Sequence, residues 1–398
     1  MKYDFDERIE RRGTHCVKWD EEAPCQTEGW LPSGGSDTSV IPMWVADMDF
    51  AVAPAIQEAV RKRAAHPIYG YTVMEDDYYE AVISWFHRRH QWSIAREHII
   101  YTTGVVPAVS CAIKALTMPG EKVLILSPDY NCFFSSIKNN GCEVSESTLR
   151  FSRDNHRFEI DWTDFGQRCA DEKTSVFLLC NPHNPTGRVW TREELQRMSD
   201  ICRQHQVRIV SDEIHCELVM PGHKFCPMGT VDKDAIILNS PSKSFNTAGL
   251  QIANIICQDA ATRRRIDRAV NINEVCDVNP FGPVALVAAY NDSEDWIDEL
   301  NEYLWDNYTA LCDFVAKNIP GWKVMPLEGT YLVWVDVSRV CGDSVATYCN
   351  HLLQEAQVWF NPGTMYGAES GKGYLRINIA CPRSLMLEAL ERIKQITK

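Results

Sequence analysis

Short apolar runs alternate with helical patterns through the middle of the chain, and this alternation constrains the fold more than any other feature. Between two of the runs, "TREELQRMSDICRQHQ" opens with a Thr191-x-x-Glu194 capping box and continues with apolar residues at helical spacing. Strands that alternate with helices predict an α/β fold with a mostly parallel, doubly wound sheet covered by helices on both faces. The runs occupy residues 123–126, 176–180, 207–210 and 235–238.

Three polar residues follow these runs at equal intervals. Asn181, Asp212 and Lys243 are separated by 31 and 31 residues. Residues just beyond the carboxyl ends of neighbouring parallel strands converge on one crevice, where ligands bind. The alternative for each residue alone is a helix cap or a solvated surface amine, but three in register favour a shared site.

Lysine and aspartate at one crevice indicate a particular chemistry. A desolvated lysine amine loses its charge and can form a Schiff base with an aldehyde, and a buried aspartate opposite it can hold a protonated ring nitrogen. Lys243 and Asp212 together would be the two side chains that a protein contributes to the chemistry of pyridoxal 5'-phosphate (PLP).

The chain changes character after about residue 291, where a long amphipathic helix is followed by two strand patterns and a final helix. We therefore expect an N-terminal arm over residues 1–50 that packs with the small domain, a large cofactor-binding domain over 51–290 and a small α+β domain over 291–398. Within the arm, residues 28–39 are rich in Gly, Ser and Pro, and we expect them to be irregular.

Charge and composition exclude several classes of partner. The 40 Lys and Arg against 54 Asp and Glu give a net charge of −14, the wrong sign for nucleic acid or an anionic membrane. The apolar runs are far shorter than the roughly 20 residues of a spanning helix, and the first residues contain no secretory h-region. We therefore expect a cytoplasmic protein whose 16 cysteines are mostly small buried hydrophobes, with no metal site.

Longer motifs narrow the choice. "NPHNPTGRVW", "VSDEIHCEL" and "NSPSKSFNTAGLQIANIIC" resemble signature segments of the fold-type I PLP-dependent aminotransferase superfamily, class I/II. "KYDF", "MWVADMDF", "YGYT", "DEIH" and "SKSFN" resemble its cystathionine β-lyase branch of the MalY/PatB type, which acts on carbon–sulfur bonds. The resemblance covers nearly the whole chain and implies PLP as the cofactor.

A phosphate site is expected where a strand passes through Gly104 into a helix, because the amides of Gly104, Val105 and Val106 would point at an anion. An ordinary strand-to-helix turn is the alternative. The resemblance adds the hydroxyls of Ser240 and Ser242.

At a further phosphate position this chain differs from many members of the superfamily. It carries Gln251 eight residues beyond the lysine, where many members have arginine. The resemblance places Tyr71 at the same phosphate across a subunit interface, which implies a homodimer with shared active sites.

Two aromatic residues are further candidates for cofactor contacts. Tyr130 follows a predicted strand and could stack on the flat cofactor. His215 lies three residues beyond Asp212, where many aminotransferases have a tyrosine that contacts the cofactor, so the resemblance implies a cofactor contact for it. A structural role is the alternative for each.

Arg376 is a charged residue within a strand pattern, "GYLRINIA". Its planar guanidinium can form two parallel hydrogen bonds with a carboxylate. A salt bridge within the protein is one alternative. The resemblance makes Arg376 the clamp on the substrate's α-carboxylate, helped by Asn181 and by the backbone near Val45 and Ala46.

The paired acids of "MWVADMDF", Asp47 and Asp49, suggest a two-carboxylate glycosidase only weakly, since two residues so close in a loop do not predict opposing carboxylates.

The sequence therefore predicts a PLP-dependent lyase that acts on small sulfur-containing amino acids, with Lys243 as catalytic base. An aminotransferase shares every step as far as the carbanion and remains an alternative. A regulatory protein that retained the fold is less consistent with a complete set of catalytic residues.

Overall fold

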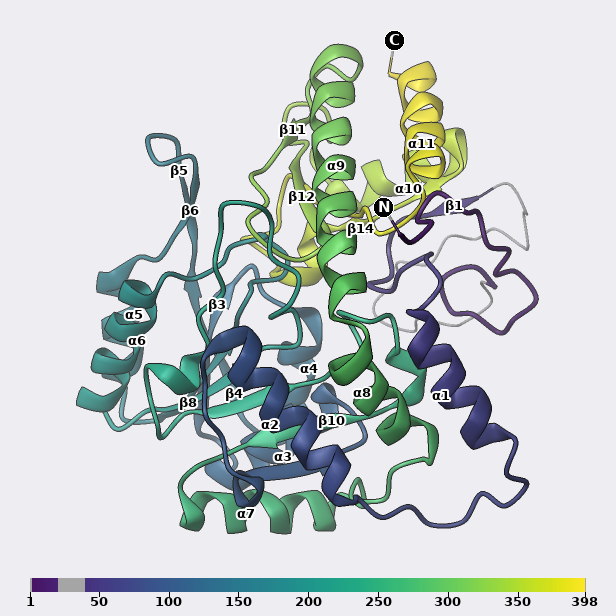
Figure 1. Ribbon diagram of the computed structural model, residues 1–398. Coiled ribbons are helices and arrows are strands. Elements are labelled where there is room, and N and C mark those ends of the chain that lie inside the picture. Colours follow the sequence, from purple (N-terminus) through teal and green to yellow (C-terminus); the bar gives the residue numbers. More distant parts are fainter. Residues whose placement is uncertain (1, 21–39, 398) are drawn as a thin grey trace.

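A seven-stranded sheet lies at the centre of the computed structural model, which describes residues 2–20 and 40–397 (Figure 1). Strand β10 runs antiparallel to both of its neighbours, and every pairing from β9 to β4 is parallel. This confirms the predicted α/β class with a mostly parallel sheet. In spatial order the strands are β2 (Ile99–Thr102), β10 (Ala253–Ile256), β9 (Ile236–Asn239), β8 (Arg208–Asp212), β7 (Thr174–Cys180), β3 (Lys122–Ser127) and β4 (Glu143–Thr148).

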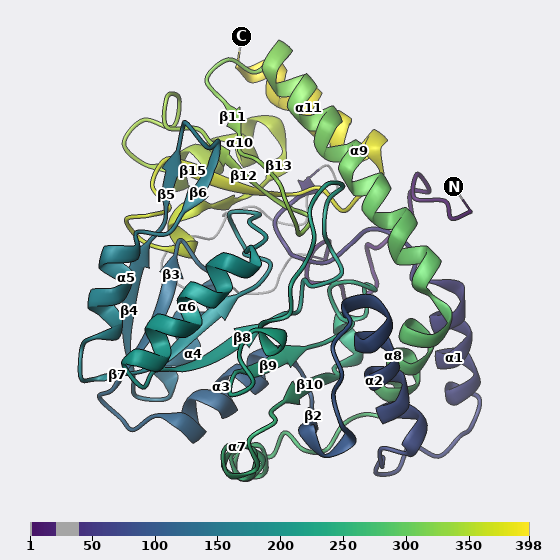
Figure 2. The ribbon, with the colours of Figure 1, turned by 60° about the vertical axis from the view of Figure 1, so that its left-hand side comes forward.

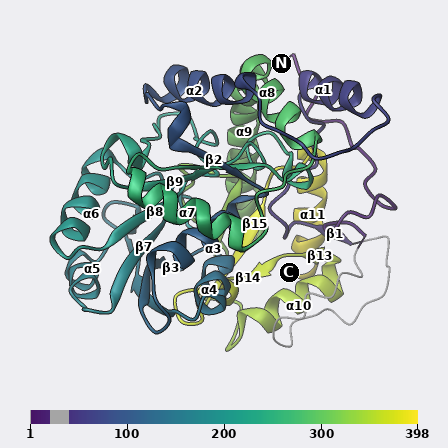
Figure 3. The same ribbon diagram turned by 90° about the horizontal axis from the view of Figure 1, so that it is seen from below.

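Strand β7 illustrates how the sheet is buried on both faces. Val176 and Leu178 join an apolar cluster with helices α3, α4 and α7, which Figure 3 shows together on one face. Phe177 and Leu179 point the other way and join a cluster that includes α5 and α6, as the two-residue period of a strand requires. The bounds are α3 (Val105–Leu116), α4 (Asn131–Asn139), α5 (Trp162–Cys169), α6 (Arg192–Gln204) and α7 (Ala260–Ile272).

The start of α6 confirms the predicted capping box. The Thr191 hydroxyl accepts from the Glu194 amide at 3.2 Å, and the Glu194 carboxylate accepts from the Thr191 amide at 2.9 Å. These two bonds satisfy amides that the first turn of a helix leaves without partners. The cap fixes where α6 begins and therefore how it returns the chain to β8.

Three further helices pack together beside the large sheet, and a hairpin extends from it (Figure 2). The helices are α1 (Pro54–Ala64), α2 (Asp76–His90) and α8 (Phe281–Asp292), and the hairpin strands are β5 (Arg150–Ser152) and β6 (Arg157–Glu159). No helix within residues 2–20 and 40–397 is long and apolar enough to cross a membrane.

The described C-terminal part contains a four-stranded antiparallel sheet in the order β11-β12-β15-β14, with α9 and α11 side by side (Figure 2). Its elements are α9 (Glu294–Asn318), β11 (Lys323–Val324), β12 (Leu332–Asp336), α10 (Val345–Ala356), β14 (Asn361–Pro362), β15 (Tyr374–Asn378) and α11 (Arg383–Ile396).

The N-terminal segment packs against the C-terminal part of the chain, where it forms a separate two-stranded sheet. Strand β1 (Ile41–Pro42) pairs in parallel with β13 (Val358–Trp359), and Phe5 packs edge-on against Trp296 of α9 at 5.7 Å. The expected division at residue 291 falls where α8 gives way to α9, and the three-part domain organisation stays a prediction. The stretch 28–39, expected to be irregular, lies outside the described residues.

Candidate active site

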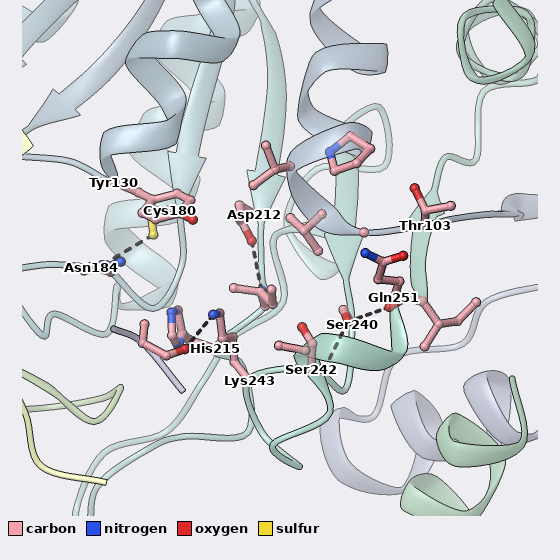
Figure 4. Close-up of a pocket in the computed structure, with 18 residues that line it drawn as sticks. Thr103, Tyr130, Cys180, Asn184, Asp212, His215, Ser240, Ser242, Lys243 and Gln251 are labelled. Carbon is pink, nitrogen blue, oxygen red and sulfur yellow. Dashed lines mark hydrogen bonds between the residues drawn. The ribbon is translucent and has the colours of Figure 1, made fainter. Parts of the chain in front are cut away.

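A cavity of about 200 Å³ lies beyond the carboxyl ends of β7, β8 and β9 (Figure 4). The first turn of α3 and the segment around Ala46 complete its wall. The parallel sheet therefore gathers most of the predicted site residues at the edge where open α/β sheets bind ligands. The predicted residues on the wall are Ala46, Gly104, Val105, Val106, Tyr130, Asp212, His215, Ser240, Ser242 and Lys243.

Lys243 lies in the turn after β9 and extends its amine into the cavity (Figure 4). The amine donates to the backbone carbonyl of Ala46 at 2.6 Å. Burial lowers the pKa of this amine, an effect that the Asp47 carboxylate opposes and the Arg376 charge reinforces. The amine is therefore closer to its nucleophilic, uncharged form than an exposed lysine is.

Asp212 ends β8 and faces the same cavity. Its Oδ1 accepts from the Ile214 amide at 3.1 Å, and within the described chain no Lys, Arg or His forms an ion pair with it. Burial raises the pKa of Asp212 to about 7, although the Lys243 charge acts in the opposite direction. The carboxylate is therefore suited to a cationic group that a ligand would bring.

The first turn of α3 forms the opposite end of the cavity. Gly104 precedes the helix, and the helix begins with Val105 and Val106, whose amides lie where a helix has no internal acceptors. The Ser240 hydroxyl donates to the Ile252 carbonyl at 2.7 Å. No described acceptor takes the hydrogen of Ser242, so that serine is the better placed of the two to bind an anion.

Tyr130 and His215 both line the cavity. The His215 ring packs edge-on against Tyr331 at 6.0 Å, and its Nδ1 is buried without a partner among the described residues. Burial, together with the Lys243 and Arg376 charges, lowers the pKa of His215 to about 3, so the ring is neutral near neutral pH. Burial also raises the pKa of the Tyr130 hydroxyl, which keeps its proton.

Arg376, in β15, is 3% exposed. It donates to the Asn184 amide oxygen at 3.2 Å and to the Trp44 carbonyl at 2.7 Å, and it lies over the Tyr366 ring at 4.7 Å. No carboxylate of residues 2–20 or 40–397 forms an ion pair with it, and its Nε is buried without a partner. This excludes a salt bridge to a described carboxylate and leaves the guanidinium free for a carboxylate from a ligand.

The structure places Asn181 off the cavity wall. The backbone N–H of Asn181 donates to the Asp212 backbone carbonyl at the edge of the sheet. Its side-chain amide donates to the Cys226 carbonyl at 3.1 Å, and the residue does not line the cavity. Asn184, three residues further on, lines the cavity and contacts Arg376. Both asparagines precede a proline in "NPHNP", and strand spacing selected the first of them, whereas the second lines the cavity.

Three other predicted residues lie off the cavity wall, and one of them, Arg376, contacts the wall residue Asn184. Val45 uses its carbonyl to accept from the Asn378 side chain at 2.5 Å, so only its neighbour Ala46 reaches the cavity. Tyr71 is 97% exposed and contributes nothing to the cavity of its own chain. Among the residues that sequence reasoning did not select, Thr103 and Cys180 also line the wall, and neither carries a distinctive signal.

The sequence profile of the family described as "Aminotransferase class I and II" matches residues 38–393. The chain belongs to the aminotransferase class I and II family. One family relative, the cystathionine β-lyase PatB of Bacillus subtilis, is 36% identical over 394 residues, which cover 98% of each chain. The family predicted from the motifs is confirmed.

Two solved structures share both fold and sequence with this chain. Cystalysin of Treponema denticola, which contains a PLP cofactor, has a TM-score of 0.92 and 34% identity, with 99% of this chain and 98% of that chain covered. The PLP-bound C-S lyase of Staphylococcus hominis has a TM-score of 0.88 and 32% identity, with 98% of each chain covered.

The buried Asp212 carboxyl generates a prediction about pH. Its pKa is raised from 3.8 to about 7, so the folded protein binds this proton more tightly than the unfolded chain does. The stability it contributes is therefore complete below about pH 4 and is lost as the pH rises through about 7. In the cofactor-free protein, Asp212→Asn removes this loss.

We expect the melting temperature of cofactor-free Asp212→Asn, relative to wild type, to be higher at about pH 8 than at about pH 5. Differential scanning calorimetry of both proteins at both pH values measures this difference. Because the comparison is between two proteins, the titration of other groups cancels. A constant difference across that pH range would show that Asp212 is ionised in the folded state throughout.

Proposed function

We propose that this protein is a PLP-dependent carbon–sulfur β-lyase that converts cystathionine- or cysteine-type amino acids to pyruvate, ammonia and a thiol. One observation carries the proposal. Asp212 and Arg376 are both buried, neither forms an ion pair with another residue of the described chain, and the Lys243 amine lies close enough to feel both charges. An amino acid joined to a cationic ring would supply the two missing charges.

The residues present fit PLP at three points. Asp212 can hold a proton on the ring nitrogen, the first turn of α3 with Ser242 can bind the phosphate, and the Lys243 amine can reach the aldehyde carbon. When bound, PLP supplies an aldehyde that combines with amines and a protonated ring that accepts the electron pair released at Cα.

The side chains around the substrate divide the remaining work. Arg376 binds the α-carboxylate through two parallel hydrogen bonds, and Asn184 orients the guanidinium. The Lys243 amine, whose pKa burial lowers, removes the proton from Cα. Neutral His215 places an unpartnered ring nitrogen in the cavity, where it can bind a polar atom of the cofactor. Breakage of the Cβ–S bond then releases the thiol.

An aminotransferase would use the same residues as far as the removal of the Cα proton, so the cavity alone does not separate the two reactions. The names of the relatives at 36% and 32% identity favour the lyase. A purely regulatory protein would have no use for a buried lysine with a lowered pKa beside an unpaired carboxylate.

We further propose a homodimer in which each site takes Tyr71 from the partner. Tyr71 is 97% exposed and lies in an exposed apolar stretch with Ile68, Tyr69 and Val73. Such a stretch is typical of a protein interface. Gln251 on the cavity wall supplies no positive charge to the phosphate, so a hydroxyl from a second chain would complete its binding.

A cytoplasmic location is also part of the proposal. Its support is that every cysteine in the described part of the chain is free, which is usual in a reducing compartment.

The first prediction concerns Lys243→Ala. Treatment of the wild-type holoenzyme with borohydride should fix the mass of reduced PLP on the peptide that contains Lys243, and the variant should gain no such mass. Cystathionine cleavage should also be lost, because the attachment point and the base are the same atom. Lys224→Ala, an exposed lysine elsewhere, serves as the control and should behave as wild type. Retention of full cleavage by Lys243→Ala would contradict the proposed function.

The second prediction separates substrate binding from cofactor binding. Arg376→Ala should raise the KM for cystathionine by about a hundredfold, because a hydrogen-bonded charge pair contributes about 2 to 5 kcal/mol. The visible absorption of the bound cofactor should stay nearly unchanged, since the proposed partner of Arg376 is the substrate. Loss of that absorption with an unchanged KM would indicate that Arg376 supports the cofactor or the fold.

The third prediction tests the shared site. Lys243→Ala and Tyr71→Ala should each be inactive alone, but a mixed dimer would contain one site with both residues intact. Co-refolding equal amounts should restore about a quarter of wild-type activity, since random pairing makes half of the dimers mixed and each has one good site. No recovery, with mixed dimers demonstrated by mass, would mean that Tyr71 does not act across the interface.

A further inference from the structure

The paired acids Asp47 and Asp49 form a buried ion network with the N-terminal arm, the purple trace near β1 in Figure 1. Arg11 binds Asp47 Oδ2 at 2.7 Å and Asp49 Oδ1 at 2.6 Å. Lys18, only 1% exposed, binds Asp49 Oδ2 at 2.7 Å. Lys18 also lies 3.6 Å from Asp47 Oδ1, so both acids pair with Lys18 as well as with Arg11, and Asp49 is itself only 4% exposed.

The residues beside these acids face the active site through their backbone. The Trp44 carbonyl accepts from Arg376 at 2.7 Å, and the Ala46 carbonyl accepts from Lys243 at 2.6 Å. One short segment, residues 44–47, therefore contacts both the proposed carboxylate clamp and the proposed base.

Side chains from the small sheet hold the same segment from the other side. Asn378 donates to the carbonyls of Val45 and Asp47 at 2.5 and 2.6 Å, and the Tyr331 hydroxyl donates to the Ala46 carbonyl at 3.0 Å. These contacts leave the peptide planes of the segment with little freedom. The charged network fixes the remaining end, next to Asp47.

We propose that Arg11 is a positioning residue for catalysis: by pairing with Asp47 and Asp49 it holds the 44–47 segment so that the Trp44 and Ala46 carbonyls orient Arg376 and Lys243. Arg11 contacts neither of those side chains in the structure and acts only through the backbone. The inference rests on the proposed function in that it assumes an amino-acid substrate, but it does not depend on which bond is cleaved.

The same arm offers a matched control. Arg8 binds Glu388 and Ser384 of α11 at 2.9 Å each, and so ties the arm to the small sheet's helix without touching the 44–47 segment. If the arm only stabilised the fold, loss of Arg8 and loss of Arg11 would have the same kind of effect on stability and on amino-acid binding. If Arg11 positions the segment, only its loss should alter amino-acid binding.

The test uses holoenzyme and L-alanine, an amino acid with a carboxylate and no leaving group on Cβ. Its dissociation constant is read from the change in cofactor absorption, per cofactor-loaded site. We expect Arg11→Ala to weaken L-alanine binding by about tenfold or more, since small misplacements of catalytic groups have large effects. Arg8→Ala should leave the dissociation constant within about twofold of wild type, and Arg11→Lys should recover part of the loss.

An unchanged dissociation constant in Arg11→Ala would overturn the proposal, as would an equal weakening in Arg8→Ala. Should Arg11→Ala fail to fold, Arg11→Gln, which keeps a polar side chain but not its charge, carries the test, and wild-type affinity in that variant with a lowered melting temperature would assign Arg11 a purely structural role. If wild type binds L-alanine but does not cleave cystathionine, the lyase function fails while this inference stands.

Discussion

A carboxylate and a guanidinium lie buried in this protein without a described side chain of opposite charge, and the organisation of the site depends on them. Leaving either charge alone in a dry interior is costly, and a ligand that supplies the opposite charges would offset that cost. Asp212 comes from the end of a strand in the large sheet and Arg376 from a strand in the small one. The two sheets must therefore keep a fixed position relative to each other for one ligand to contact both Asp212 and Arg376.

Burial also sets the other protonation states around the cavity. It lowers the pKa of Lys243 and of His215, and it raises the pKa of the Tyr130 hydroxyl, so each of these groups favours its neutral form. Burial likewise raises the pKa of Asp212 to about 7, so a cationic group of a ligand would favour its charged form. A neutral Lys243 near the Arg376 guanidinium fits the proposed removal of a Cα proton from a substrate whose α-carboxylate Arg376 binds.

Much of this arrangement could be predicted from sequence, because strand ends in a parallel sheet recur at regular intervals. Asp212 and Lys243 were identified in this way, and the Thr191 cap was identified from its local motif. Asn181 lies off the cavity wall because equal spacing locates the end of a strand but not the direction of its side chain. The carbonyl acceptors of Trp44 and Ala46 could not be predicted, since a backbone carbonyl has no sequence signature and Arg376 is more than 300 residues away from Trp44.

The central claim is that the electron pair released at Cα forms a double bond to Cβ while the Cβ–S bonding pair leaves with the thiol, so that no oxo acid is needed to complete the reaction. It is tested most directly by incubating the holoenzyme with L-cystathionine in the presence and absence of an excess oxo acid, and measuring pyruvate and free thiol together. The account predicts equal amounts of both products at a rate that the oxo acid does not change. Absence of pyruvate without the oxo acid, with amino transfer in its presence, would contradict the lyase and establish an aminotransferase.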